Sequence, residues 1–133
     1  MSNRTVIVKQ RHDYDCGIAS LSMLLNTPYG DIAALVILLN PDPKDRRNGM
    51  NMKDLEAVIE ECGFKTKRVY RKEGYLDHAT GILGLLGTQM GPGGHWVYIK
   101  DGMILDPDGG EAWEADDYVK ELKARPATLL TII

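Results

Sequence analysis

The chain has 133 residues, of which 44% are hydrophobic and 26% charged, and its formal net charge is −3. These values are typical of a soluble globular protein, and we expect a single domain over residues 1–133. The mildly acidic balance argues against a nucleic-acid partner, and no apolar run is long enough to span a membrane. The N-terminus lacks a secretory signal pattern and two cysteines indicate no disulfide framework, so we expect a cytoplasmic protein with reduced thiols.

Helical patterns dominate the first half of the sequence. A β-branched run over 5–9 predicts a strand or extended lead-in, and an apolar helix follows over about 16–26, ended by Pro28. A second, largely buried helix is expected over 31–39. It is followed by a charged loop over 41–50.

The next predicted helix has clear signals at both ends. Asn51 is a good N-cap, and Asp54 stands at the third helical position, where its side chain can bond back to the cap. Gly63 follows the last turn as a C′ glycine. Apolar residues recur between these ends at the spacing of one helix face: Leu55, Val58, Ile59 and Cys62. On this pattern Cys62 is expected to be buried as a small apolar side chain.

The second half of the sequence is rich in strand patterns. Strands are expected at 64–70, 82–89, 95–100, 103–106 and 127–133, with a short helix at 115–124. Asp101-Gly102, between two of these strands, is a strong signal for a two-residue hairpin turn. Alternation along the strand that begins at His95 places Trp96 on the opposite face, in the core. Helices followed by antiparallel strands predict an α+β fold, with N-terminal helices packed on a C-terminal antiparallel sheet.

Cys16 stands at or just before the first turn of the helix predicted over 16–26. Free N–H groups and the helix dipole favour a thiolate at such a position. Gln10 lies six residues upstream, where its amide can swing back over the helix N-terminus. Together with the backbone N–H of the cysteine, this amide would form an oxyanion hole. We therefore expect Cys16 to act as a nucleophile and Gln10 to support it.

The base is expected from a distant part of the chain, because catalytic partners are adjacent in space and not in sequence. His95 opens a strand, and Asp106 ends the strand that faces it across the predicted hairpin. The two-residue turn sets Asp106 within one or two residues of the position opposite His95. An aspartate there can accept the imidazole N–H and orient the ring toward Cys16.

The segment from position 10 to 24, QRHDYDCGIASLSML, resembles the active-site stretch of the C39 peptidases. These are papain-like cysteine peptidase domains that trim double-glycine leader peptides from bacteriocin precursors. The resemblance continues at 49–55, 62–64, 94–97 and 106–110, and then at Trp113 and the closing strand.

The resemblance implies a papain-like fold and a cysteine peptidase acting on a peptide or protein substrate, without cofactor or metal. By position it implies Cys16 as nucleophile, His95 as base, Asp106 as orienting carboxylate and Gln10 in the oxyanion hole. The best-known members are domains of membrane ABC exporters, whereas this sequence contains neither membrane spans nor a nucleotide-binding domain. We therefore expect a stand-alone form, and the sequence indicates no particular oligomeric state.

Two other functions fit the same residues. A thioester forms on such a cysteine whichever acyl donor is bound, so acyl transfer or deamidation of the transglutaminase kind is one alternative. The other is a non-catalytic module that keeps the peptide-binding groove. Because the nucleophile, base and carboxylate all stand in the expected order, the peptidase is preferred.

A metal site is a further possibility that the spacing of ligands disfavours. Its candidate ligands are His12, Cys16, His78 and His95. Zinc ligands usually come in closely spaced pairs, and His12 with Cys16 is the only such pair here. His12 also competes with His95 as the base, but only Asp13 and Asp15 lie near it in sequence to orient it.

Overall fold

The computed structural model describes residues 7–11, 15–44, 49–70, 79–87 and 94–133. Its N-terminal helices are α1 (Cys16–Leu25), α2 (Tyr29–Leu39) and α4 (Met52–Glu61). The strands of its sheet are β1 (Thr66–Tyr70), β2 (Gly81–Leu86), β3 (His95–Lys100), β4 (Met103–Asp106), β5 (Glu111–Glu114) and β6 (Arg125–Ile132). A short helix, α5 (Ala115–Glu121), connects β5 to β6.

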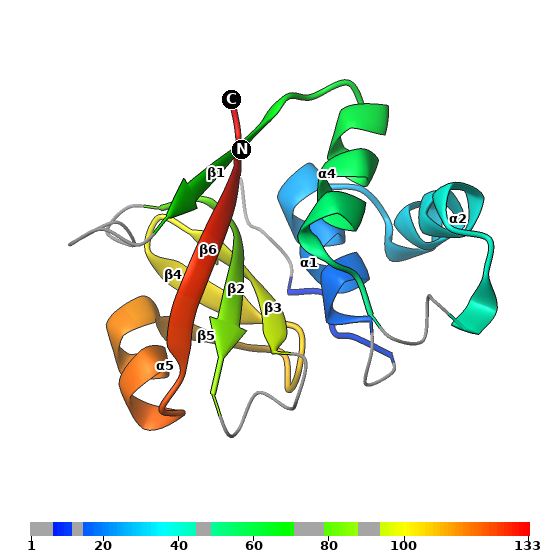
Figure 1. The fold of residues 1–133 in the computed structure, drawn as a ribbon. Coiled ribbons are helices and arrows are strands. Elements are labelled where there is room, and N and C mark those ends of the chain that lie inside the picture. The colour runs from blue at the N-terminus through cyan, green and yellow to red at the C-terminus, as the bar shows by residue number, and fades with distance from the viewer. Residues whose placement is uncertain (1–6, 12–14, 45–48, 71–78, 88–93) are drawn as a thin grey trace, which may run out of the picture.

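The antiparallel sheet lies between the N-terminal helices on one face and α5 on the other (Figure 1). Its strand order is β1-β6-β2-β3-β4-β5, and each neighbouring pair is antiparallel. One face packs against α1, α2 and α4 through a core that includes Leu21, Ile32, Leu55, Ile82 and Leu130. The other face packs against α5 through a core that includes Leu83, Leu85, Val97, Ile99 and Tyr118. The predicted α+β class, with N-terminal helices on an antiparallel sheet, is confirmed.

Helix α1 is apolar on most sides because it lies between the sheet and the other N-terminal helices (Figure 1). It ends at Leu25, and the capping residue Asn26 has a left-handed backbone (φ 48°) and donates its N–H to carbonyls of the last turn. The predicted helix over 16–26 is therefore confirmed. Pro28, in contrast, does not end α1 but caps the start of α2, which begins at Tyr29 rather than at Asp31.

Helix α4 has the capping box that the sequence predicts. The Asp54 N–H donates to Asn51 Oδ1 at 2.9 Å, and the Asn51 N–H donates to Asp54 Oδ2 at 3.0 Å. Gly63 follows the helix with a positive φ of 91°. The prediction that Cys62 is buried is wrong, since the residue is exposed. The helix ends at Glu61, so Cys62 belongs to the cap, and the buried stripe stops one turn earlier at Ile59.

The β3–β4 hairpin forms in the predicted register, with Tyr98 opposite Leu105 and Lys100 opposite Met103. Its turn residues Asp101 and Gly102 both have positive φ, 49° and 79°, as a type I′ turn requires. This hairpin fixes how His95, which opens β3, lies relative to the end of β4.

Other expectations differ from the structure in detail. The remaining predicted strands and the helix α5 are present with ends shifted by a few residues. Strand β5 was not expected, and positions 43 and 44 are helical within the predicted loop. Of the strand or extended lead-in predicted over 5–9, residues 5 and 6 lie outside the described residues, and residues 7–9 are not a strand. Within the described ranges, no single helix is long and apolar enough to cross a membrane.

Candidate active site

Cys16 is the first residue of α1, and only 9% of it is exposed to solvent. Its sulfur lies where α1 meets β3, and the backbone N–H of Trp96 approaches Sγ at 3.5 Å. This N–H and the positive end of the helix dipole both stabilise negative charge on the sulfur. The sulfur is therefore held between the N-terminal end of α1 and a backbone N–H of β3.

Trp96 connects the helical layer to the sheet. Its indole N–H donates to the Met50 carbonyl at 2.7 Å, and its own carbonyl accepts a hydrogen bond from Ser20 Oγ at 3.3 Å. The ring packs on the helical core, which confirms the prediction that Trp96 faces the core. Glycines make room for Trp96 and for Met50, which accepts its indole N–H: a Cβ at Gly84 would lie 2.8 Å from the Trp96 ring, and one at Gly17 would lie 3.1 Å from Met50 Sδ.

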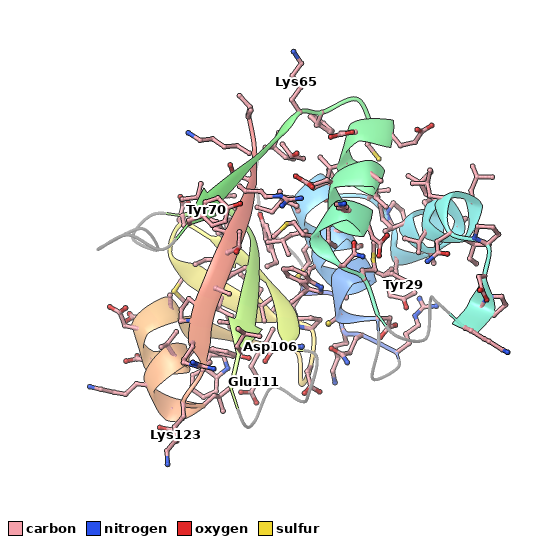
Figure 2. All side chains as sticks on the ribbon, viewed as in Figure 1. Tyr29, Lys65, Tyr70, Asp106, Glu111 and Lys123 are labelled. Carbon is pink, nitrogen blue, oxygen red and sulfur yellow. The ribbon has the colours of Figure 1, made fainter. Side chains whose placement is uncertain are left out.

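His95 and Asp106 form a close pair across the β3–β4 hairpin. His95 Nε2 lies 2.7 Å from Asp106 Oδ1, and both side chains are about nine-tenths buried. Asp106 Oδ1 also accepts the Asp108 N–H at 2.9 Å, while Oδ2 accepts the Tyr118 hydroxyl at 2.7 Å. The carboxylate is thus fixed by donors from three residues. Figure 2 shows Asp106 near Glu111, at one end of the sheet.

The Cys16 side chain lies close enough to the imidazole of His95 to act on its pKa. Since Nε2 bonds to Asp106, the nitrogen left for the thiol is Nδ1. Burial of the ring disfavours its protonation, but the hydrogen bonds and charges of Asp106 and Cys16 outweigh burial and raise the pKa of His95 to about 10. At neutral pH the ring is therefore an imidazolium that can donate a proton.

Gln10 lies beside the turn that follows Asp106. Its backbone N–H donates to the Pro107 carbonyl at 2.9 Å, and its Oε1 atom is buried. The entry segment before α1 is therefore attached to the sheet at the end of β4. The oxyanion role of Gln10 stays a prediction.

Asp15, just before Cys16, is a buried carboxylate that the sequence analysis considered only as a partner for His12. Only 1% of it is exposed, and its Oδ2 accepts hydrogen bonds from the Arg11 N–H at 2.9 Å and from the Tyr29 hydroxyl. The Arg11 guanidinium lies 4.1 Å from the centre of the Tyr29 ring. These contacts join the turn before Cys16 to α2, where Figure 2 labels Tyr29. Nothing in the local sequence pattern indicates this long-range partner.

Tyr118 is the second residue that sequence reasoning missed. It lies on α5, and the sequence shows only a tyrosine on a short predicted helix. Its contact with Asp106 arises because α5 folds back against β4, which local patterns do not reveal.

The alternative metal site and the alternative base both depend on residues that the structure does not describe. His12 and His78 lie outside the described residues, so neither the metal site nor the competing base is tested at those positions. Within the described ranges, no three His, Cys, Asp or Glu side chains form a group that could hold a metal ion.

Two cavities flank the candidate site. The first, of about 370 Å³, lies among α1, α2 and α4, and its mainly apolar lining includes Ile18, Val36, Ile37, Leu39, Met50 and Val58. The second, of about 340 Å³, is more polar and lies on the α5 side of the sheet. Its lining includes His95, Asp106, Asp108, Glu111, Trp113 and Tyr118.

Solved structures of similar fold come from peptidase domains. The peptidase domain of Streptococcus ComA, a bi-functional ABC transporter involved in a quorum sensing pathway, has a TM-score of 0.70 at 14% identity, covering 97% of this chain and 98% of that chain. A double glycine motif protease from an AMS/PCAT transporter, solved in complex with the leader peptide, has a TM-score of 0.65 at 17% identity, covering 96% and 89%. The Streptococcus mutans ComA peptidase domain has a TM-score of 0.60 at 15% identity, covering 96% and 98%.

The sequence comparisons identify the family. A search of curated proteins finds no match. The model of the peptidase C39 family matches residues 4–112, which include Cys16, His95 and Asp106. Because this match spans most of the chain and the fold agrees with solved C39 peptidase domains, the protein belongs to the peptidase C39 family.

Proposed function

We propose that the protein is a cysteine endopeptidase in which Cys16 attacks, His95 transfers protons and Asp106 orients the imidazole. The observation that carries this proposal is the pairing of His95 with Asp106 Oδ1 at 2.7 Å, beside a Cys16 side chain close enough to raise the pKa of the imidazole. A nucleophile, a base and a group that orients the base are the three parts that covalent acyl transfer requires.

The first half of the proposed reaction forms a thioester. The Cys16 thiolate attacks the carbonyl carbon of the scissile peptide bond, and the negative charge moves to the carbonyl oxygen. The side-chain amide of Gln10 and the backbone N–H of Cys16 are the proposed donors to that oxygen. As the C–N bond breaks, His95 gives its Nδ1 proton to the leaving amine.

The second half releases the acyl group. Water attacks the thioester and transfers a proton to the neutral His95, after which the C–S bond breaks and the thiolate returns. Asp106 stabilises the imidazolium at both stages without taking its proton.

We propose a peptide or protein substrate cleaved after a small residue such as glycine. The burial of Cys16 supports this, because a bulky side chain at the cleavage point would hold the carbonyl away from the sulfur. The apolar cavity among α1, α2 and α4 has room for apolar side chains of the same peptide. The related double glycine motif protease binds a leader peptide, which supports the same substrate class.

A peptide library incubated with wild-type protein and with Cys16→Ala tests the proposal. We expect mass spectrometry to find new peptide termini with the wild type, enriched in small residues before the cut, and none with Cys16→Ala. Crosslinked or deamidated peptides would point instead to another acyl transfer. Peptides that are retained but unmodified by the wild type would indicate a binding module.

A further inference from the structure

The carboxylate of Asp106 is held on both of its oxygens, but by different parts of the fold. Oδ1 faces His95 Nε2 and the Asp108 N–H, so it is bound within the β3–β4 hairpin and its following turn. Oδ2 accepts only the Tyr118 hydroxyl among the hydrogen bonds described, at 2.7 Å, and this donor comes from α5. The orientation of the carboxylate thus depends on a helix that contributes no reacting atom.

Tyr118 is itself rigidly placed. Only 1% of it is exposed, and its ring packs edge-on against Trp113, with centroids 5.8 Å apart and planes at 86°. The first residue of α5 is tied to the hairpin, since the Ala115 N–H donates to the Gly102 carbonyl at 3.0 Å. The turn that pairs β3 with β4 therefore also anchors the helix that carries the hydroxyl.

The carboxylate needs such a donor because its last torsion is soft. Rotation about the Cβ–Cγ bond of aspartate has a broad, nearly two-fold profile, so the side chain alone does not fix its plane. The polar cavity of about 340 Å³ beside Asp106 leaves space for that rotation. A hydroxyl fixed on Oδ2 removes this freedom and keeps Oδ1 in line with His95.

We propose that Tyr118 is a positioning residue of the active site, whose hydroxyl orients Asp106 so that Asp106 in turn orients His95 toward Cys16. This inference rests on the proposed peptidase function, but the contact it describes is measurable without a substrate. Burial and the hydrogen bond to Asp106 raise the pKa of Tyr118, so its hydroxyl stays a donor throughout the working pH range.

Tyr118→Phe tests the proposal by removing one oxygen while keeping the buried ring. We expect the NMR titration of His95 to move to lower pH by about one unit. Without the Tyr118 hydroxyl the Asp106 carboxylate can rotate, so Oδ1 is less well aligned with His95 and stabilises the imidazolium less. The part of the pH profile of Cys16 alkylation by limiting iodoacetamide that follows the deprotonation of His95 should move to lower pH by the same amount. On any substrate found, kcat/KM should fall by about tenfold with little change in KM.

Matched variants separate positioning from general loosening of the fold. Tyr98→Phe removes a buried tyrosine hydroxyl from β3 on the other face of the sheet, and we expect the His95 titration to stay unchanged. Trp113→Phe keeps the Tyr118 hydroxyl but removes part of the aromatic ring that packs against Tyr118. We expect it to shift the His95 titration in the same direction by a smaller amount. In an Asp106→Asn background, Tyr118→Phe should cause no further shift of the His95 titration, because Tyr118 affects His95 only through Asp106.

The proposal is overturned if Tyr118→Phe lowers the melting temperature while the titration of His95 and the alkylation profile of Cys16 stay as in the wild type. A shifted His95 titration in a protein that cleaves no peptide would support the positioning role while removing the peptidase function. The two failures are therefore distinguishable.

Discussion

At the scale of single residues, His95 lies between two groups that each favour its charged form. Asp106 contributes a carboxylate 2.7 Å from Nε2, and the side chain of Cys16 also raises the pKa of the ring. The pKa of about 10 follows because these two contributions exceed the cost of burying the imidazolium. Either partner alone would leave the ring less protonated.

We therefore predict that Asp106→Asn moves the alkaline limb of the kcat/KM profile to lower pH. In the wild type, activity should persist until His95 loses its proton near pH 10, and the variant loses that proton earlier because its carboxamide carries no charge. The profile is measured with the best peptide from the library. Glu111→Gln is the matched control, because Glu111 faces Asp106 in the sheet register but is exposed to solvent. An alkaline limb that is the same in wild type and Asp106→Asn would contradict this account of His95.

At the scale of elements, the packing between β2 and β3 requires a glycine at position 84. Gly84 on β2 lies opposite Trp96 on β3, and the Trp96 ring occupies the space where a Cβ would stand. The same Trp96 donates its backbone N–H toward the Cys16 sulfur and its indole N–H to Met50. A change in β2 is therefore transmitted to the candidate nucleophile through one aromatic ring.

Gly84→Ala is predicted to displace Trp96, destabilise the fold by about 1–3 kcal/mol and slow the alkylation of Cys16. Urea unfolding measures the first effect and iodoacetamide labelling the second. Gly30→Ala is the control: Gly30 is in α2 with open space around its Cβ position, so we expect no loss and a small gain in stability. If Gly84→Ala unfolds and reacts like the wild type, the close packing of Trp96 is not required.

How far the sequence predicts these elements depends on the range of the interactions involved. The cap at Asn51 and the turn at Asp101-Gly102 are determined by neighbours a few residues away, and both were predicted. The close approach of His95 to Asp106 was predictable because one hairpin sets it. The contact between Tyr118 and Asp106 was not, because it depends on α5 packing across the sheet.

Two other differences have the same physical origin. The periodic apolar pattern continues to Cys62, but whether a position is buried depends on what packs against the helix end, and no pattern carries that information. Strand β5 has the sequence EAWE, with two charged ends and no clear alternation of polarity, and it forms because β4 offers a partner edge. Local sequence therefore predicts neither the exposure of Cys62 nor the formation of β5.

At the scale of the whole molecule, the proton on His95 couples the candidate site to folding. The ring binds its proton up to about pH 10 in the folded protein but only up to its usual 6.5 when unfolded. The folded state is thereby favoured in full below pH 6.5, progressively less between 6.5 and 10, and not at all above that range.

We predict that the stability difference between the wild type and His95→Gln shrinks as pH rises from about 6.5 to 10. The free energy of unfolding in urea at pH 6, 8 and 10 measures it for both proteins. Taking the difference cancels titrations that the two proteins share. A difference that is constant over this range would show that the His95 pKa is not raised.

Trp96 gives the molecule one further property. The sulfur belongs to a helix and the imidazole to a strand, and the bonds of Trp96 to Ser20 and Met50 join these two layers beside the sulfur. A rigid-body parting of the layers by a small amount would separate the sulfur from both its N–H donor and its imidazole, without breaking a single hydrogen bond inside either layer. The chemical reactivity of Cys16 would then depend on the distance between the helical layer and the sheet.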